Sequence, residues 1–266
     1  MSKLILRDAM KRFNVGTVNE KVALNHLDFT LEDGDFVTVI GGNGAGKSTL
    51  LNIISGVYPL DSGSIELANT DVSRFPEHRR ARFIGRVFQD PMMGTASEMS
   101  IEENLAMANK RGKQRGLGSG IHKGDRGRFI RSLKQLGLGL EGRLKDKAGL
   151  LSGGQRQALT LLMATIQRPD LLLLDEHTAA LDPSTASKVL RLTEELIAEH
   201  HLSTLMVTHN MKDALSYGNR LIMLDKGHII ADIPQEVKET LQVRDLLYLF
   251  SQVSGGEMTS DRMLLI

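Results

Sequence analysis

A glycine-rich octapeptide constrains the fold of this chain more than any other feature. Residues 41–48 read Gly-Gly-Asn-Gly-Ala-Gly-Lys-Ser, which fits the pattern G-x-x-x-x-G-K-[ST]. The preceding segment, Phe36–Ile40, is apolar and largely β-branched, and apolar residues recur at helical spacing from Leu50 to Ile54. A buried strand, a glycine loop and a helix in this order predict an α/β fold with a mostly parallel sheet.

This phosphate loop, residues 41–48, predicts a site for nucleotide phosphates. Glycines let successive backbone N–H groups point inward, and the helix N-terminus adds positive potential. Lys47 would bring a positive charge to the β- and γ-phosphates, and the Ser48 hydroxyl would bind Mg²⁺. A plain glycine turn is disfavoured, because the pattern arises by chance in a chain of this length only at about the per cent level. The residues expected to contact the nucleotide here are Gly41, Asn43, Gly44, Ala45, Gly46, Lys47, Ser48 and Thr49.

An apolar strand that ends in two acids is the second candidate element. Leu171–Leu174 is followed directly by Asp175 and Glu176. At the carboxyl end of a parallel strand, Asp175 is expected to hold Mg²⁺, directly or through water, while Glu176 polarises the attacking water. Taken alone, the pair is equally consistent with an ordinary acidic turn. Downstream of a phosphate loop, the magnesium interpretation is favoured.

Composition excludes several classes of function. The chain has no cysteine, which rules out disulfides, Cys-ligated zinc, iron–sulfur clusters and thiol nucleophiles. Its 33 Lys and Arg against 32 Asp and Glu leave a net charge of +1, so no nucleic-acid footprint covers the whole protein. The N-terminus, residues 1–8, becomes charged before a signal-peptide core forms, and no apolar run is long enough to span a bilayer. We therefore expect a membrane role only through a partner.

The signature segment, Leu151–Gln155, reads Leu-Ser-Gly-Gly-Gln at the predicted start of a helix. Together with the phosphate loop and the acidic strand end, it resembles the signature of the ATP-binding-cassette (ABC) ATPases. The match extends over residues 1 to about 231. Further residues follow in the family's order: Phe13 resembles its adenine-stacking aromatic residue, which is more often Tyr, Gln89 its Q-loop, Ala180–Asp182 its D-loop and His209 its switch histidine.

The resemblance implies an ATPase that needs ATP, Mg²⁺ and a second copy of itself. Two copies pack head to tail, and each signature closes over the γ-phosphate held by the other copy. In this scheme Glu176 deprotonates water, His209 contacts the γ-phosphate, and Gln89 senses Mg²⁺. The implied catalytic residues are Glu176, His209, Gln89 and Lys47, and the implied metal ligands are Ser48, Gln89 and Asp175. The implied nucleotide-binding residues further include Phe13 and, toward the nucleotide held by the other copy, Ser152, Gly153, Gly154, Gln155 and Asp182.

The expected domain organisation follows from changes in composition and from the motif order. The short apolar runs Leu4–Leu6 and Leu24–Leu31 predict an N-terminal antiparallel β portion. The expected parts are a nucleotide-binding core at residues 1–96 and 151–231, an inserted helical subdomain at 97–150 and a C-terminal helical tail at 232–266.

Three features depart from the family pattern or are not explained by it. His177 follows the acidic pair where the family has Pro or Ala, so it is either a packed histidine or a titratable group that makes turnover depend on pH. Residues 110–131 carry eight Lys and Arg, which fit a solvated loop, a contact with anionic lipid or an RNA-binding loop. Met92 and Met93 fit either the core or a surface for a membrane subunit.

A single cassette on its own chain resembles the ATPase subunits of bacterial importers. The resemblance implies permease subunits as partners, a solute-binding protein in the same system and a place on the cytoplasmic face of the membrane. The segment Asp175–Pro183 is similar to that of an uptake subgroup for amino acids. Two alternatives stay open, a cassette for lipid or lipoprotein extraction and a soluble ABC ATPase that acts on ribosomes or DNA.

Overall fold

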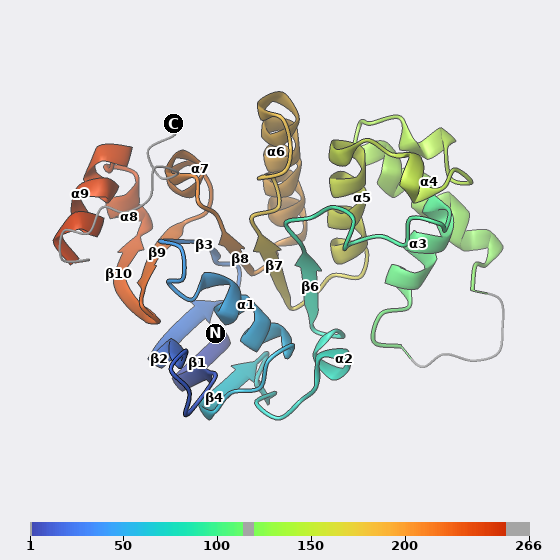
Figure 1. Cartoon of the computed structure of the whole chain (residues 1–266). Coiled ribbons are helices and arrows are strands. Elements are labelled where there is room, and N and C mark those ends of the chain that lie inside the picture. Colours follow the sequence, from blue (N-terminus) through green and yellow to red (C-terminus); the bar gives the residue numbers. More distant parts are fainter. Residues whose placement is uncertain (1, 114–119, 254–266) are drawn as a thin grey trace. The chain divides into compact units, whose positions relative to one another are not determined.

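The apolar segments predicted to be buried strands are strands in the computed structural model, which describes residues 2–113 and 120–253. The chain divides into two structural units (Figure 1). One unit spans Met1–Arg80 and Ser203–Ile266, and the other spans Ala81–Leu202. The domain boundaries expected from the sequence rest instead on changes in composition and on the order of the motifs. They stay a prediction.

The first unit contains the phosphate loop and most of the described strands. Its elements are β1 (Ser2–Phe13), β2 (Lys21–Glu32), β3 (Phe36–Gly41), α1 (Lys47–Ser55), β4 (Ser62–Leu67), β5 (Thr70–Asp71), α2 (Glu77–Arg80), β8 (Thr204–Val207), α7 (Met211–Ser216), β9 (Arg220–Asp225), β10 (His228–Pro234), α8 (Gln235–Lys238) and α9 (Val243–Val253).

Strand β3 lies at the centre of this unit, between two parallel neighbours. Val39 pairs with Val207 of β8 and with Ile222 of β9, and β10 pairs antiparallel with β9. All six residues of β3 are buried, as is typical of a parallel strand covered on both faces. The predicted α/β fold with a mostly parallel sheet is confirmed.

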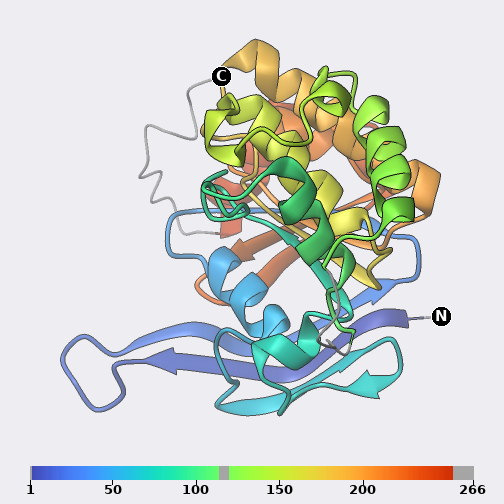
Figure 2. The ribbon, with the colours of Figure 1, turned by 90° about the vertical axis from the view of Figure 1, so that its right-hand side faces the viewer.

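The N-terminal strands form a separate antiparallel sheet in the order β2, β1, β4, β5 (Figure 2). Strands β1 and β2 are twelve residues each, much longer than the apolar runs that predicted them. Asp8 and His26 both have left-handed backbone, with φ of 52° and 49°, and they interrupt the regular pairing of the two strands. The predicted antiparallel β portion is confirmed.

Helix α9 packs against the central strands of its unit. Its buried Leu246 belongs to one apolar cluster with Ile40 of β3 and Met223 of β9, and Phe250 packs against that cluster. The helix therefore shields one face of the sheet from water.

The second unit combines a parallel strand pair with helices. Its elements are β6 (Ile84–Val87), α3 (Ile101–Asn109), α4 (Lys123–Gln135), the 3₁₀ helices η1 (Leu140–Gly142) and η2 (Ala148–Leu150), α5 (Gly153–Thr165), β7 (Leu171–Asp175) and α6 (Pro183–His200). Among the described residues of the chain, no helix is both long and apolar enough to cross a membrane.

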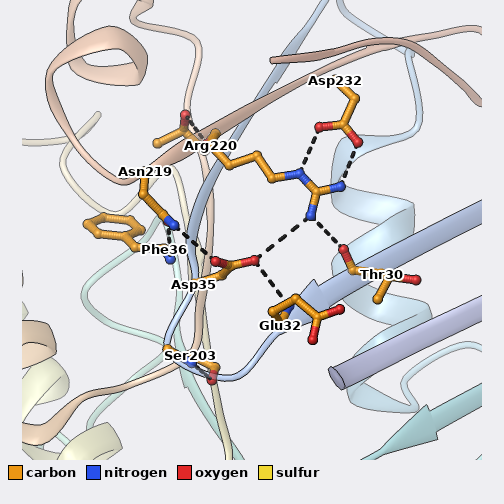
Figure 3. A network of polar contacts seen from close by, with 10 residues as sticks. Thr30, Glu32, Asp35, Phe36, Ser203, Asn219, Arg220 and Asp232 are labelled. Atoms are coloured by element: carbon orange, nitrogen blue, oxygen red, sulfur yellow. Dashed lines mark hydrogen bonds and ion pairs between the residues drawn. The ribbon is translucent and has the colours of Figure 1, made fainter. Parts of the chain in front are cut away.

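Arg220 connects several parts of the first unit through a polar network (Figure 3). Its guanidinium donates to both carboxylate oxygens of Asp232, at 2.7 and 2.5 Å, and to the carbonyl oxygen of Thr30 at 2.7 Å. It also lies 3.9 Å from the carboxylate of Asp35, in the turn that leads into β3. The network therefore holds β2, β9 and β10 in place around the start of the central strand.

Replacing Arg220 with Met is expected to lower the free energy of unfolding by about 2 kcal/mol, because its charge-assisted hydrogen bonds to Asp232 and Thr30 are lost. Urea denaturation measures this loss. Arg7→Met is the matched control, since Arg7 is 60% exposed and lies 3.5 Å from Glu66. Its loss should stay below about 0.5 kcal/mol. Equal losses in the two variants would contradict the assigned role of the network.

Candidate functional site

The phosphate loop joins the buried strand β3 to helix α1 as predicted. Gly46 immediately precedes the helix and has a φ of 108°. A Cβ atom there would lie 2.4 Å from the carbonyl oxygen of Ala23, so only glycine fits. The first N–H groups of a helix lack partners within it, which makes those of Ser48 and Thr49 available to a phosphate group.

The side chain of Lys47 is held within the phosphate loop. Lys47 is 8% exposed, and its ammonium donates to the carbonyl oxygens of Gly41 at 2.7 Å and Gly42 at 3.1 Å. A positive charge is thus fixed next to the helix N-terminus, and both favour an anionic ligand. The loop has the charge and the donors that phosphate binding requires.

Phe13 is the last residue of β1 and lies near the phosphate loop. It pairs with Lys21 across the hairpin, and the Lys21 amine lies 2.8 Å from where a Cβ atom of Gly44 would stand. The Phe13 ring makes an edge contact with Tyr58 at a centroid distance of 5.3 Å. Tyr58 was not predicted as a neighbour, because it follows α1 and is far from Phe13 in sequence.

His209 lies at the same edge of the sheet as the phosphate loop. It follows β8, and the N–H of Thr208 donates to the carbonyl oxygen of Val39 at 3.1 Å. The next residue, Asn210, caps helix α7 by accepting from the N–H groups of Lys212 and Asp213. Burial raises the pKa of Asp213, while the charge of His209 acts in the opposite direction. The first unit thus brings together Phe13, the phosphate loop and His209.

In the second unit, the acidic pair and Gln89 share one edge of a strand pair. Val87 of β6 pairs in parallel with Leu174 of β7, so Gln89, Asp175 and Glu176 all lie at the carboxyl ends of the two strands. The amide of Gln157 on α5 donates to the carbonyl oxygen of Phe88 at 3.0 Å. This bond holds the residue before Gln89 in place.

Arg86 is a neighbour of the acidic pair that the sequence analysis did not identify. Its guanidinium lies 3.2 Å from a carboxylate oxygen of Asp175, and the two side chains are 12% and 15% exposed. The guanidinium also lies 4.7 Å from the ring centroid of Phe88. The available signal was an arginine inside an otherwise apolar strand, which requires an acidic or π partner when it is shielded from water.

The signature segment begins helix α5 and lies against the D-loop. The Ser152 hydroxyl accepts from the N–H of Gln155 in a capping box. A Cβ atom on Gly154 would lie 2.1 Å from Thr185 on helix α6, so a side chain there would force the two helices apart. Asp182 caps α6 by accepting from the N–H of Thr185 at 3.0 Å, and its pKa is lowered by hydrogen bonds from that residue. The second unit thus brings together the signature and the D-loop.

His177 is a packed histidine rather than a titratable group near neutral pH. It is 2% exposed, and burial lowers its pKa to about 4. The imidazole therefore stays neutral throughout the range where the alternative interpretation required it to titrate. We expect His177→Ala to leave the pH dependence of ATP turnover unchanged above pH 6.

Three arginines of residues 110–131, Arg111, Arg126 and Arg128, make contacts within their unit. Arg111 donates to the carbonyl oxygens of Ala164 and Gln167, each at 2.9 Å. Arg126 pairs with Glu102 at 2.7 Å, and Arg128 pairs with Asp125 at 3.1 Å. Arg115 lies outside the described residues. These contacts assign a structural role to Arg111, whereas the side chains of Arg126 and Arg128 stay 55% and 44% exposed.

Met92 and Met93 lie on the surface and not in the core. Their exposed fractions are 56% and 68%. Arg156, which follows the signature segment, contacts the sulfur of Met92. The interpretation as a contact surface for a partner therefore remains, and the core interpretation is wrong.

Comparison with known proteins shows the family to which the chain belongs. A family model described as ABC transporter matches residues 24–179. The chain is 46% identical to a tyrosine transport ATP-binding protein of Clostridioides difficile over 226 residues, which cover 85% of this chain and 89% of that protein. It is 33% identical to a phosphonates import ATP-binding protein of Frankia casuarinae, with 87% and 90% covered.

Solved structures with the same fold are ATP-binding cassettes. A dimeric cassette in a post-hydrolysis state, bound to ADP and Pi, is 28% identical with a TM-score of 0.74, and the match covers 87% of this chain and 98% of that one. An ABC transporter cassette in its ADP conformation is 25% identical with a TM-score of 0.77, and 94% and 98% are covered. The chain belongs to the ABC transporter family and is one of its ATP-binding, ATP-hydrolysing cassettes.

Proposed function

We propose that this ATPase powers the import of an amino acid across a bacterial membrane. The observation that carries the proposal is the 46% identity to a tyrosine transport ATP-binding protein, which extends over 89% of that protein. A methionine import ATP-binding protein of Enterococcus faecalis is 32% identical over 87% of this chain. The cassette does not bind the cargo itself, so the proposal names the class of cargo and not one amino acid.

Nucleotide binding is assigned to the phosphate loop and to Phe13. The loop N–H groups and Lys47 would hold the phosphates, and the Phe13 ring would stack on the base. The Ser48 hydroxyl, the Asp175 carboxylate and the Gln89 amide are hard oxygen donors of the kind that Mg²⁺ prefers. Bound Mg²⁺ would neutralise charge on the β- and γ-phosphates during transfer to water.

Hydrolysis is assigned to Glu176, with support from His209 and Gln89. The Glu176 carboxylate would orient a water molecule and accept its proton. His209 would donate to the γ-phosphate, and Lys47 would stabilise the charge that develops there. Gln89 would transmit the nucleotide state of the site to the segment that carries Met92 and Met93.

A second copy of the chain is proposed to complete each site. Ser152, Gly153, Gly154 and Gln155 form a helix N-terminus suited to an anion, and Asp182 lies beside them. These residues would close on the γ-phosphate held by the partner copy. ATP then joins the two copies and hydrolysis releases them, which converts binding energy into movement.

The proposed partners are integral-membrane permease subunits and a solute-binding protein. The chain would lie at the cytoplasmic face of the membrane, held there by the permease. Purification from native membranes in mild detergent, followed by mass spectrometry, tests this assignment. Recovery with a polytopic permease and a solute-binding protein supports import. Recovery with a lipoprotein-releasing system, or with ribosomes or DNA, overturns import but leaves the ATPase activity in place.

The surface formed by Met92 and Met93 provides a direct test of permease docking. Met93→Glu is expected to reduce recovery of the permease at least about tenfold, because a buried unpaired charge is costly at an interface. Nucleotide affinity should stay unchanged. Met107→Glu is the matched control, since Met107 is also exposed, at 41%, but lies on helix α3. Full permease recovery with Met93→Glu would exclude this surface from the interface.

A further inference from the structure

The loop after β7 holds Glu176 in an uncommon backbone conformation. The φ of Glu176 is 43°, in the left-handed region that residues other than glycine seldom adopt. The N–H of Ala179 donates to the Glu176 carbonyl oxygen at 2.9 Å, and that of Leu181 donates to the Thr178 carbonyl oxygen at 3.1 Å. Such a backbone persists only where surrounding contacts fix it.

His177, the next residue, makes such a contact with helix α6. Its Nε2 atom lies 3.1 Å from the Oγ1 atom of Thr193, and the two residues are 2% and 1% exposed. The Thr193 hydroxyl donates its single proton to the carbonyl oxygen of Val189 at 2.8 Å. Its oxygen is therefore the acceptor for His177, and the imidazole carries its proton on Nε2. A neutral histidine with one defined donor thus joins the loop to the helix.

We propose that His177 is a positioning residue for ATP hydrolysis, whose hydrogen bond to Thr193 fixes the adjacent Glu176 relative to helix α6. The inference rests on the proposed role of Glu176 as the base for water. Because His177 shares a peptide bond with Glu176, anchoring its side chain restricts the rotation of that peptide. Asp182 caps the start of the same helix, so the bond also connects the loop of the proposed base to the D-loop.

The position of Glu176 matters more for the chemical step than for nucleotide binding. A displacement of about 1 Å in a reacting group can lower a rate by about 10²-fold. Phosphate binding is assigned to residues of the first unit, whereas His177 and Thr193 belong to the second. A positioning role therefore predicts a loss of kcat with little change in nucleotide affinity, whereas a purely structural role predicts reduced stability alone.

Substitutions at Thr193 test the bond without altering the loop itself. Thr193→Val keeps the shape but removes the acceptor, and it should lower kcat of the full chain about 10–100-fold while the KM for ATP and the Kd for ADP stay within about twofold. Thr193→Ser keeps the hydroxyl and should retain kcat. Thr165→Val is the matched control, because Thr165 is also buried on a helix and donates to the carbonyl oxygen of Leu161 at 2.9 Å. Thr165→Val should lower the free energy of unfolding about as much as Thr193→Val does, but it should retain kcat.

Variants at His177 test the same hydrogen bond through its donor. His177→Ala should lose kcat as Thr193→Val does, and His177→Gln, which keeps an N–H donor, should restore part of it. Combining His177→Ala with Thr193→Val should cost no more than either change alone. All rates are measured well below the lowest melting temperature in the set. If one of the two bond-breaking variants, His177→Ala or Thr193→Val, does not fold, the other still decides whether the hydrogen bond is required.

The outcomes separate this inference from the proposed function. Wild-type kcat in both Thr193→Val and His177→Ala, together with an inactive Glu176→Gln, overturns the positioning role but leaves Glu176 as the base. A loss of kcat in Thr165→Val equal to that in Thr193→Val also overturns it, because stability alone would then explain both. Normal turnover in Glu176→Gln would instead remove the proposed function on which the inference rests.

Discussion

Replacing Glu176 with Gln is expected to lower ATP turnover by about 10²–10⁴-fold, the usual effect of removing a general base. The amide keeps the size of the side chain but does not accept a proton from water. Nucleotide binding should persist, because it is assigned to the phosphate loop and to Phe13. ATP should then hold two copies together, and size-exclusion chromatography with ATP and Mg²⁺ should show a dimer that the wild-type chain forms only transiently.

The matched control removes one negative charge elsewhere in the same unit. Glu195 is exposed on helix α6, and Glu195→Gln should leave both turnover and the elution volume unchanged. Turnover by Glu176→Gln within about threefold of wild type would exclude this carboxylate as the base, since the expected loss is at least about 10²-fold. The search for the base would then move to the other polar groups near the ends of β6 and β7.

Much of the candidate site could be predicted because its motifs are contiguous. The phosphate loop and the signature segment each carry their own helix start, and the caps at Ser152 and Asp182 depend only on residues within a few positions. The acidic pair was identifiable because an apolar strand directly precedes it. In all these cases local sequence and local structure favour the same conformation.

Contacts between distant segments could not be predicted from local patterns. Strand β9 forms beside β3, although about 180 residues separate them along the chain, and neither β9 nor β10 was expected. In β10 most residues are only partly buried or exposed, and Asp232 interrupts its apolar residues, so it lacks the continuous apolar run of a buried strand. Strand β4 was missed for the same reason, since its first half faces water. Pairing with a partner, and not local propensity, stabilises such strands.

The contacts of Arg86 and His177 could not be predicted from the sequence for a related reason. Each makes its decisive contact with another strand or helix: Arg86 of β6 contacts Asp175, and His177 contacts Thr193 of α6. Sequence alone left His177 open between a packed and a titratable group, and only its burial decides between them. The left-handed backbone of Glu176 likewise depends on the fold around it, because nothing in the residue type favours it.

Replacing Gly46 with Ala is expected to weaken ADP binding at least about 100-fold. The added Cβ atom would lie 2.4 Å from the Ala23 carbonyl oxygen and 3.2 Å from the Leu24 side chain, at a φ of 108° that L-residues rarely adopt. The loop must therefore shift, and its N–H groups move away from the phosphates. Losing two charge-assisted hydrogen bonds of about 1.5 kcal/mol each accounts for a factor of about 100. Isothermal titration calorimetry with ADP and Mg²⁺ measures it.

Gly137→Ala is the control that separates backbone strain from loss of the phosphate site. Gly137 has a φ of 65°, and a Cβ atom there would meet nothing within 4 Å. This variant should cost about 1–2 kcal/mol of stability through its left-handed backbone but should bind ADP as the wild-type chain does. ADP affinity in Gly46→Ala equal to that of Gly137→Ala would show that the phosphate loop tolerates displacement. Its N–H groups would then contribute little to binding, and the assignment of the loop as the main phosphate contact would be wrong.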